Sequence, residues 1–114
     1  MAKLKVEKQI GGVILHLSGQ FIGGEETDEL KQLLQEIAES NVKKLIINLA
    51  DVTYLNSTAL GVLIASHTNF VKRQGEVILC NISKSIENIF VITKLTLVFK
   101  IAETLDEAIK NFSN

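Results

Sequence analysis

The sequence predicts an α/β fold in which a mixed, mostly parallel sheet is built from an N-terminal edge strand followed by four βα units. Two observations support this prediction. Short apolar runs typical of buried strands alternate along the chain with segments whose apolar residues recur at helical spacing. The chain contains no proline, so the breaks between these segments fall at glycines and at changes of period. Such alternation is typical of parallel sheets with right-handed crossovers.

The N-terminal part of the chain predicts a strand hairpin followed by an amphipathic helix. Residues 4–9 alternate apolar and polar side chains, and residues 13–18 form an apolar, β-branched run after the Gly11-Gly12 turn. Acidic residues then crowd the expected helix start, where the macrodipole favours negative charge: Glu25, Glu26, Asp28 and Glu29. Apolar residues follow at the spacing of a helix with one buried face: Leu30, Leu33, Leu34, Ile37 and Ala38.

The rest of the chain alternates between short apolar runs and helical patterns. The runs predict buried strands at residues 45–49, 76–80 and 97–101. Helical spacing predicts helices over residues 57–73, 83–93 and 104–112, the last of which opens with a capping box. In a sheet of this kind, ligands and partners bind at the carboxyl ends of the strands, around the starts of the helices that follow.

Length and composition restrict the classes of function. A chain of 114 residues and 12.6 kDa is long enough for one core and too short for two, so residues 1–114 are expected to form a single domain. The net charge of −1 provides no overall field for recruiting nucleic acid or an anionic membrane. One cysteine, Cys80, excludes a disulfide scaffold, and the two distant histidines show no metal-ligand spacing, so we expect neither metal nor cofactor.

One stretch of the chain, residues 52–71, contains no Asp, Glu, Lys or Arg. A membrane-spanning helix needs about 20 predominantly apolar residues, whereas this stretch includes several Ser, Thr, Asn and His side chains. The charged N-terminus also lacks the apolar core of a signal peptide. We therefore expect a cytoplasmic protein without a membrane span, in which the uncharged stretch has another role.

Two junctions between a predicted strand and a predicted helix could carry function, at residues 19–24 and 51–61. The second lies within residues 48–63, NLADVTYLNSTALGVL, which resemble the signature of STAS domains and specifically of bacterial anti-sigma factor antagonists. Three further landmarks are similar to that family and occur in its order: Leu17-Ser18-Gly19, Asn81 and the closing helix from Thr104 to Ala108. The resemblance covers nearly the whole chain and implies a STAS-type domain, a mixed sheet with four βα units.

The resemblance implies a partner-switching regulator that is not itself an enzyme. In the family, the unphosphorylated protein binds an anti-sigma factor that is also a serine kinase. Phosphorylation of the first serine of the signature releases the complex, and a phosphatase reverses the change. That serine corresponds to Ser57, with Thr58 as the alternative acceptor. The expected partner contacts are Gln20, Phe21, Ile22, Gly23, Gly24, Thr53, Tyr54, Leu55, Asn56, Thr58, Ala59 and Gly61.

The residue types at this junction also suit a switch on physical grounds. A helix N-terminus has main-chain N–H groups without partners and a partial positive charge, so it accommodates a phosphate. Phosphorylation adds about −1.5 to −2 charges to a stretch that has none of its own. Without the resemblance, Ser57 and Thr58 are ordinary residues of a helix start and Asn56 is its cap.

Three positions depart from the family pattern. The aspartate before the serine is Asn56, a glycine is Ala59, and an acidic position near the first junction is Ile22. Asn caps a helix about as well as Asp, so the fold is expected to be unaffected. The two missing carboxylates could change how a kinase recognises the site. Their absence favours an alternative function, a constitutive STAS interaction module (a signalling scaffold or a transporter-associated subunit) that is not phosphorylated.

A serine hydrolase is the enzyme class that could compete with these two functions. In such enzymes the nucleophilic serine lies in a sharp turn between a strand and a helix, the nucleophile elbow. Leu55 and Ala59 occupy the two glycine positions of that motif. His67 follows Ser57 on the same predicted helix, roughly 15 Å away at 1.5 Å per residue, which is too far for a base. We therefore expect no hydrolase activity.

Overall fold

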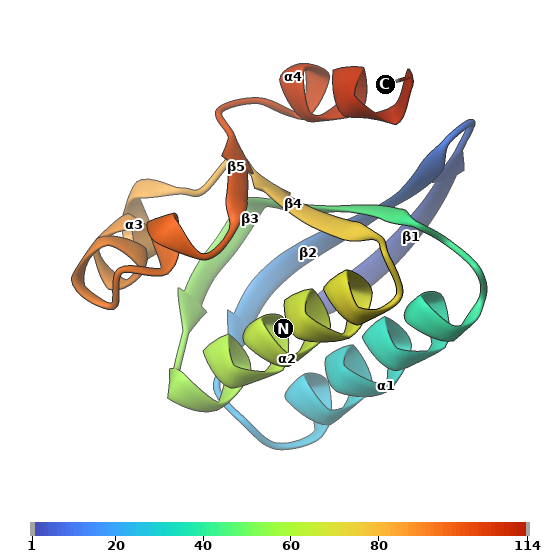
Figure 1. Cartoon of the computed structure of the whole chain (residues 1–114). Coiled ribbons are helices and arrows are strands. Elements are labelled where there is room, and N and C mark those ends of the chain that lie inside the picture. Colours follow the sequence, from blue (N-terminus) through green and yellow to red (C-terminus); the bar gives the residue numbers. More distant parts are fainter. Residues whose placement is uncertain (1, 114) are drawn as a thin grey trace.

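Five strands form one sheet in the order β1-β2-β3-β4-β5 in the computed structural model, which describes residues 2–113 (Figure 1). The strands are β1 (Lys3–Gln9), β2 (Gly12–Phe21), β3 (Lys44–Leu55), β4 (Glu76–Cys80) and β5 (Lys100–Ala102). β1 runs antiparallel to β2, whereas each later strand runs parallel to its neighbour. The predicted mixed, mostly parallel sheet with an N-terminal edge strand is confirmed.

In this part of the chain, four α-helices and two short 3₁₀-helices connect and cover the strands. They are α1 (Glu25–Glu39), α2 (Ser57–Lys72), α3 (Lys84–Ile92), η1 (Leu95–Leu97), α4 (Leu105–Ile109) and η2 (Lys110–Ser113). α1 and α2 lie side by side on one face of the sheet, and α4 lies on the other face (Figure 1). Within residues 2–113, no helix is both long enough and apolar enough to span a bilayer.

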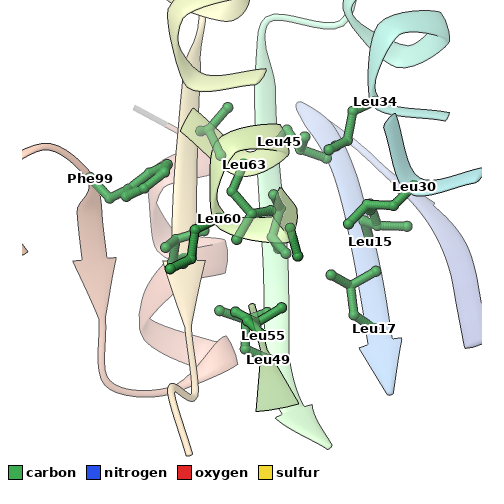
Figure 2. Close-up of a cluster of buried hydrophobic side chains, with 14 of the residues drawn as sticks. Leu15, Leu17, Leu30, Leu34, Leu45, Leu49, Leu55, Leu60, Leu63 and Phe99 are labelled. Atoms are coloured by element: carbon green, nitrogen blue, oxygen red, sulfur yellow. The ribbon is translucent and has the colours of Figure 1, made fainter. Parts of the chain in front are cut away.

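Adjacent residues of the central strands face opposite layers, which explains why these strands read as continuous apolar runs. Ile14, Ile46 and Ile78 lie side by side across β2, β3 and β4, and Ala108 of α4 packs in the same cluster. Their chain neighbours face the larger core under α1 and α2. Figure 2 shows leucines from strands and helices meeting there, among them Leu15, Leu17, Leu30, Leu34, Leu45, Leu49, Leu60 and Leu63. This core fixes the starts of both helices relative to the strands that precede them.

The third strand is longer than predicted. We expected it to cover residues 45–49, whereas β3 continues to Leu55. Its pairing with β2 contains register shifts in this region, and the buried side chains Leu49, Val52 and Leu55 recur every three residues. A search for strand alternation with a period of two misses such a segment, because bulges change which face each residue occupies. As a result, residues 51–55 belong to a strand, and Asn56 alone separates β3 from α2.

The strand predicted over residues 97–101 was wrong in its first half. η1 ends at Leu97, a turn follows at residues 98–99, and β5 begins only at Lys100. Leu95 and Phe99 are buried four residues apart, and the N–H of Phe99 donates a 3.0 Å hydrogen bond to the carbonyl of Leu95. Leu97, between them, is 82% exposed. The apolar run therefore follows a helical turn, and only its end enters the sheet.

The last predicted helix, over residues 104–112, was too long. α4 ends at Ile109 and the 3₁₀-helix η2 follows. The Asn111 side-chain amide donates to the carbonyls of Glu107 at 3.4 Å and Ala108 at 3.3 Å. Such side-chain bonds satisfy carbonyls that a continuing α-helix would use, so the helix tightens after its first turns. The predicted cap at its start is present, since the Thr104 hydroxyl accepts from the N–H of Glu107 at 3.1 Å.

Candidate functional site

The second helix begins at Ser57 because Asn56 caps it. Asn56 has an extended backbone, and its side-chain Oδ1 accepts a 3.0 Å hydrogen bond from the N–H of Ala59. Its carbonyl oxygen accepts a second 3.0 Å bond from the N–H of Leu60. The N–H groups of Ser57 and Thr58 have no acceptor within the helix, as in the first turn of any helix. Both of these side chains are exposed.

The connection between β2 and α1 lies directly beside this helix start. The N–H of Asn56 donates a 3.0 Å hydrogen bond to the carbonyl of Phe21, which pairs with Leu55 at the end of the parallel ladder. Gly23 also approaches the cap, because a methyl group on its α-carbon would lie 3.8 Å from Asn56 Nδ2. The two junctions found in the sequence are therefore adjacent in space, at the carboxyl ends of β2 and β3.

The β2–α1 connection has a backbone shape that suits glycine. Gly23 and Gly24 have φ of +89° and +78°, which side chains disfavour. The buried hydroxyl of Thr27 accepts a 2.9 Å hydrogen bond from the N–H of Gly23. Thr27 was not predicted as a site residue. The sequence contains one indication of this role. Thr27 lies in the first turn of a helix whose N-cap, Gly24, has no side chain that could accept a hydrogen bond.

A carboxylate lies beside Ile22, at which the STAS resemblance implies an acidic residue. Glu26 Oε1 accepts a 3.3 Å hydrogen bond from the N–H of Ile22. The first turn of α1 contains two further acidic residues, Glu25 and Asp28. The acidic side chains beside the β2–α1 connection therefore come from the first turn of α1.

Each of the two junctions has an exposed apolar side chain. Ile22 and Tyr54 keep 52% and 49% of their surface exposed. With Ser57, Thr58 and Gly61 they form the set of exposed residues that we call the Ser57 surface. These five residues are uncharged, but Glu25 and Glu26 line a hollow with Ile22, and Lys31 lines a groove with Thr58 and Gly61. Apolar groups that remain exposed beside polar groups are typical of protein contact sites, in which they become buried.

The structure divides the 12 predicted contact residues into two groups. Phe21, Leu55 and Ala59 are core residues with at most 1% of their surface exposed, so their side chains support the site from below. The others are exposed or half-buried: Gln20, Ile22, Gly23, Gly24, Thr53, Tyr54, Asn56, Thr58 and Gly61. The Thr53 hydroxyl donates a 3.3 Å bond to the carbonyl of Gly19, which fixes β3 against β2 here.

A groove of about 580 Å³ between α1 and α2 extends from Thr58 along the second helix. Lys31 and Lys72 lie on its walls, and Ser66 lines it with a buried hydroxyl that has no hydrogen-bond partner among the described residues. This groove is not visible in the sequence, because it arises only when two helices separated by a strand lie side by side.

A chain of polar side chains crosses the face of the sheet opposite α1 and α2. Asn48 Oδ1 accepts from Asn81 Nδ2 at 3.0 Å and from the N–H of Ala50 at 3.1 Å, so its amide NH₂ faces His16 Nδ1, 3.0 Å away. His16 Nε2 then donates to Glu7 Oε1 at 2.9 Å. This bond, with a second from Gln9, holds the pKa of the Glu7 carboxyl below its usual range. These residues were not predicted to interact.

The nucleophiles and bases of the described chain are not assembled at Ser57. The ring of His67 packs edge-on against Phe99, with centroids 5.3 Å apart, and His16 belongs to the polar chain on β2. Cys80 is buried, and burial raises the pKa of its thiol to about 11.

The chain belongs to the STAS domain family, whose model matches residues 3–108. A relative at the sequence level is BtrV from Bordetella bronchiseptica, which is named as an anti-sigma factor antagonist. The two are 23% identical over 110 residues, which covers 96% of this chain and 94% of BtrV.

Solved structures have the same fold. An anti-sigma factor antagonist from Mycobacterium paratuberculosis matches with a TM-score of 0.86 and 23% identity, over 100% of this chain and 96% of that one. The anti-sigma factor antagonist SpoIIAA matches in its unphosphorylated form with a TM-score of 0.79 and 16% identity, over 98% and 99% of the chains. Its phosphorylated form from Bacillus matches with a TM-score of 0.76 and 19% identity, over 96% and 98%.

Proposed function

We propose that this protein is an anti-sigma factor antagonist, a non-enzymatic regulator that binds an anti-sigma factor with serine kinase activity and is released when that kinase phosphorylates Ser57. A phosphatase restores the binding form, and the exchange takes place in the cytoplasm. The observation that carries the proposal is the position of Ser57, which is exposed in the first turn of α2 and lies beside the connection between β2 and α1.

The chemistry needs only an accessible hydroxyl from this chain. The kinase supplies ATP, magnesium and a base. The Ser57 oxygen attacks the γ-phosphorus, its proton passes to the base, and ADP leaves. The N–H groups at the start of α2 and the helix dipole then favour the new phosphate in the free protein.

The same phosphate would oppose binding. Ile22 and Tyr54 are the exposed apolar groups that a partner would cover, and Ser57 lies in the same surface. A phosphate of about −1.5 to −2 charges loses water when that surface is covered, at a cost that the uncharged neighbours do not offset. A modest loss of binding free energy is sufficient for release, since about 2.7 kcal/mol already weakens binding a hundredfold.

Relatives of this chain support the proposal. BtrV and the Mycobacterium paratuberculosis protein are named as anti-sigma factor antagonists. SpoIIAA, which shares the fold, occurs in an unphosphorylated and a phosphorylated form. The acidic first turn of α1 beside the Ser57 surface would also attract a partner with basic residues at its contact site.

The proposal is tested by incubating the protein with the anti-sigma factor kinase encoded near it in the genome, with ATP, and mapping phosphopeptides. We expect modification of the wild type and of Thr58→Ala, and none of Ser57→Ala. Phosphorylation of Ser57→Ala at Thr58 with the same efficiency would move the switch to Thr58. An unmodified wild-type protein in a stable complex would contradict the proposal.

One observation favours a second candidate, the constitutive interaction module. Asn56 and Ile22 stand where the family has acidic residues, which removes two groups that a kinase could recognise. In this case the same surface binds a scaffold or a transporter-associated partner, and Ser57→Asp leaves the affinity unchanged. A neighbouring gene for a transporter, and none for a kinase or sigma factor, would favour this candidate.

A further inference from the structure

We propose that β1 pairs with the β1 strand of a second copy, antiparallel and about a two-fold axis at Val6, so that two sheets join into one. The proposal is independent of the function assigned to the Ser57 surface. It rests on the free edge of β1, on the order of its charges and on the apolar side chain at its centre.

The strand is available for pairing because it lies at the edge of the sheet. β1 is the first strand in the order and pairs with β2 along one side over seven residues, from Lys3 to Gln9. No strand of the described chain lies along its other side (Figure 1), so the main-chain N–H and C=O groups of that side have no partner strand. An edge of this length is a template for another strand unless its side chains prevent it.

The charges of β1 permit one symmetric register. In an antiparallel pair, residues directly opposite each other share a face of the sheet. A two-fold axis at Val6 places Lys5 opposite Glu7 of the second copy, twice by symmetry, and Lys3 opposite Gln9. Every opposite pair is then of unlike charge or includes an uncharged residue. Unlike charges directly opposite each other stabilise a strand pair, whereas like charges destabilise it.

The other symmetric registers either place like charges together or pair almost none of β1. An axis at Lys3, Lys5, Glu7 or Lys8 sets that residue opposite its own copy, and an axis at Leu4 sets Lys3 opposite Lys5. An axis at Gln9 leaves Gln9 opposite Gln9 as the single pair within β1. Lysines on an edge strand usually prevent self-pairing. In β1 the charged side chains disfavour the other symmetric registers, so they select pairing about Val6.

The centre of the register is apolar and exposed. Val6 is 40% exposed and lies opposite Leu15, a member of the core under α1 and α2, so it faces the helix side of the sheet. Beside it, a groove of about 630 Å³ is lined by the apolar residues Leu33, Ile37 and Val42 and also by the charged residues Lys8, Glu36 and Lys43. Pairing would bring Val6 against Val6 of the second copy and cover this apolar edge on both.

On the opposite face, Glu7 is already held in place for the contact. Its Oε1 accepts from His16 Nε2 at 2.9 Å and its Oε2 from Gln9 Nε2 at 2.6 Å. The pKa of this carboxyl is lowered by these bonds, so it is ionised at neutral pH. A carboxylate whose position is fixed loses less entropy when a lysine from another chain binds it.

The test uses the mass of the full chain in solution, by sedimentation equilibrium at protein concentrations up to about 1 mM, the range of weak association. We expect the mass to rise from 12.6 kDa toward twice that value. In the Val6 register, Lys5→Glu sets two carboxylates opposite each other, and Glu7→Lys sets two ammonium groups opposite each other. Each variant should weaken self-association about tenfold or more.

The decisive sample is an equal mixture of Lys5→Glu and Glu7→Lys. In the Val6 register both contacts between these two variants are again of unlike charge, so the mixture should regain the dimer that neither forms alone. Val6→Lys should abolish dimerisation, whereas Leu97→Lys, a change to lysine at an exposed apolar residue outside β1, should not. Circular dichroism establishes that each variant is folded.

A wild-type protein that stays monomeric at every concentration would overturn the proposal. So would a mixture that does not associate although both variants are folded. A dimer that survives Val6→Lys and is lost in Leu97→Lys would also overturn it, because the contact would then lie near η1.

Discussion

The main-chain N–H of Asn56 donates a 3.0 Å hydrogen bond to the carbonyl oxygen of Phe21. This bond joins the start of α2 to the connection that precedes α1, although the two residues lie in different βα units. The Asn56 side chain meanwhile caps α2 through the N–H of Ala59. One residue thus sets the position of Ser57 and ties it to Ile22, the exposed apolar residue of the neighbouring connection.

Replacement of the cap tests this arrangement. Asn56→Ala removes the bond to Ala59 and should lower the free energy of unfolding by about 1 kcal/mol, within a range of about 0.5–2 kcal/mol. Asn56→Asp keeps the acceptor and restores the family's residue, so its stability should match the wild type. Urea unfolding of the three proteins measures the difference. Equal stability of Asn56→Ala and wild type would show that the cap contributes nothing.

The same substitution to aspartate also tests the missing carboxylate. If a kinase reads an acidic residue before the serine, Asn56→Asp should speed phosphorylation of Ser57 without changing stability. A rate equal to that of the wild type would indicate that the kinase needs no carboxylate at position 56. Either Glu26, which accepts a hydrogen bond from the Ile22 N–H, then meets the requirement, or the kinase needs no carboxylate there.

A substitution at Gly61 should affect stability and partner binding in opposite directions. It lies exposed inside α2, and a methyl group there would have no atom within 4 Å. Gly61→Ala should therefore raise the free energy of unfolding by roughly 0.5–1 kcal/mol, since glycine is a poor helix former. If a partner packs closely on the Ser57 surface, the methyl group should also weaken binding. Gain of stability with unchanged affinity would place Gly61 outside the contact.

The lowered pKa of Glu7 predicts a dependence of stability on pH. A carboxyl whose pKa is lower in the folded state stabilises it above the ordinary value of about 4.3. That contribution is lost as the pH falls through the lowered pKa. The difference in unfolding free energy between wild type and Glu7→Gln should thus be larger at pH 7 than at about pH 3. A difference that does not vary with pH would contradict the assigned bonds.

Cys80 should be unreactive in the folded protein. Its side chain is buried and its pKa is raised to about 11, so roughly 0.1% of the thiol is ionised at about pH 8. A thiol reagent should label the protein at a rate set by unfolding, and at once in concentrated urea. Rapid labelling without urea would show that the strand is accessible.

The order of strands and helices follows from the sequence because it depends on local periodicity. The core runs of β2, β3 and β4 and the apolar stripe of α1 are each recognisable within about ten residues. The extension of β3 to Leu55 was missed because bulges replace a period of two by a spacing of three. The strand near Leu97 was misplaced because an exposed leucine in a 3₁₀ turn resembles a strand residue.

The site was predictable only in part. Asn56, Ser57 and the glycine pair at Gly23-Gly24 are visible in the sequence because caps and turns have strong residue preferences. The bonds from Thr27 and Glu26 to the neighbouring connection were not predicted, because they depend on where α1 begins. The burial of Phe21, Leu55 and Ala59 is likewise a consequence of packing between elements far apart in the chain.

The central claim is that a phosphate on Ser57 controls binding, and the affinity of the partner tests it most directly. Calorimetry would compare the unphosphorylated protein with protein phosphorylated at Ser57, each titrated with the anti-sigma factor. We predict that phosphorylation weakens binding about a hundredfold, a difference of about 2.7 kcal/mol. Ser57→Ala, treated with kinase and ATP in the same way, should keep the affinity of the unphosphorylated protein. Equal affinities for the phosphorylated and unphosphorylated forms would contradict the account.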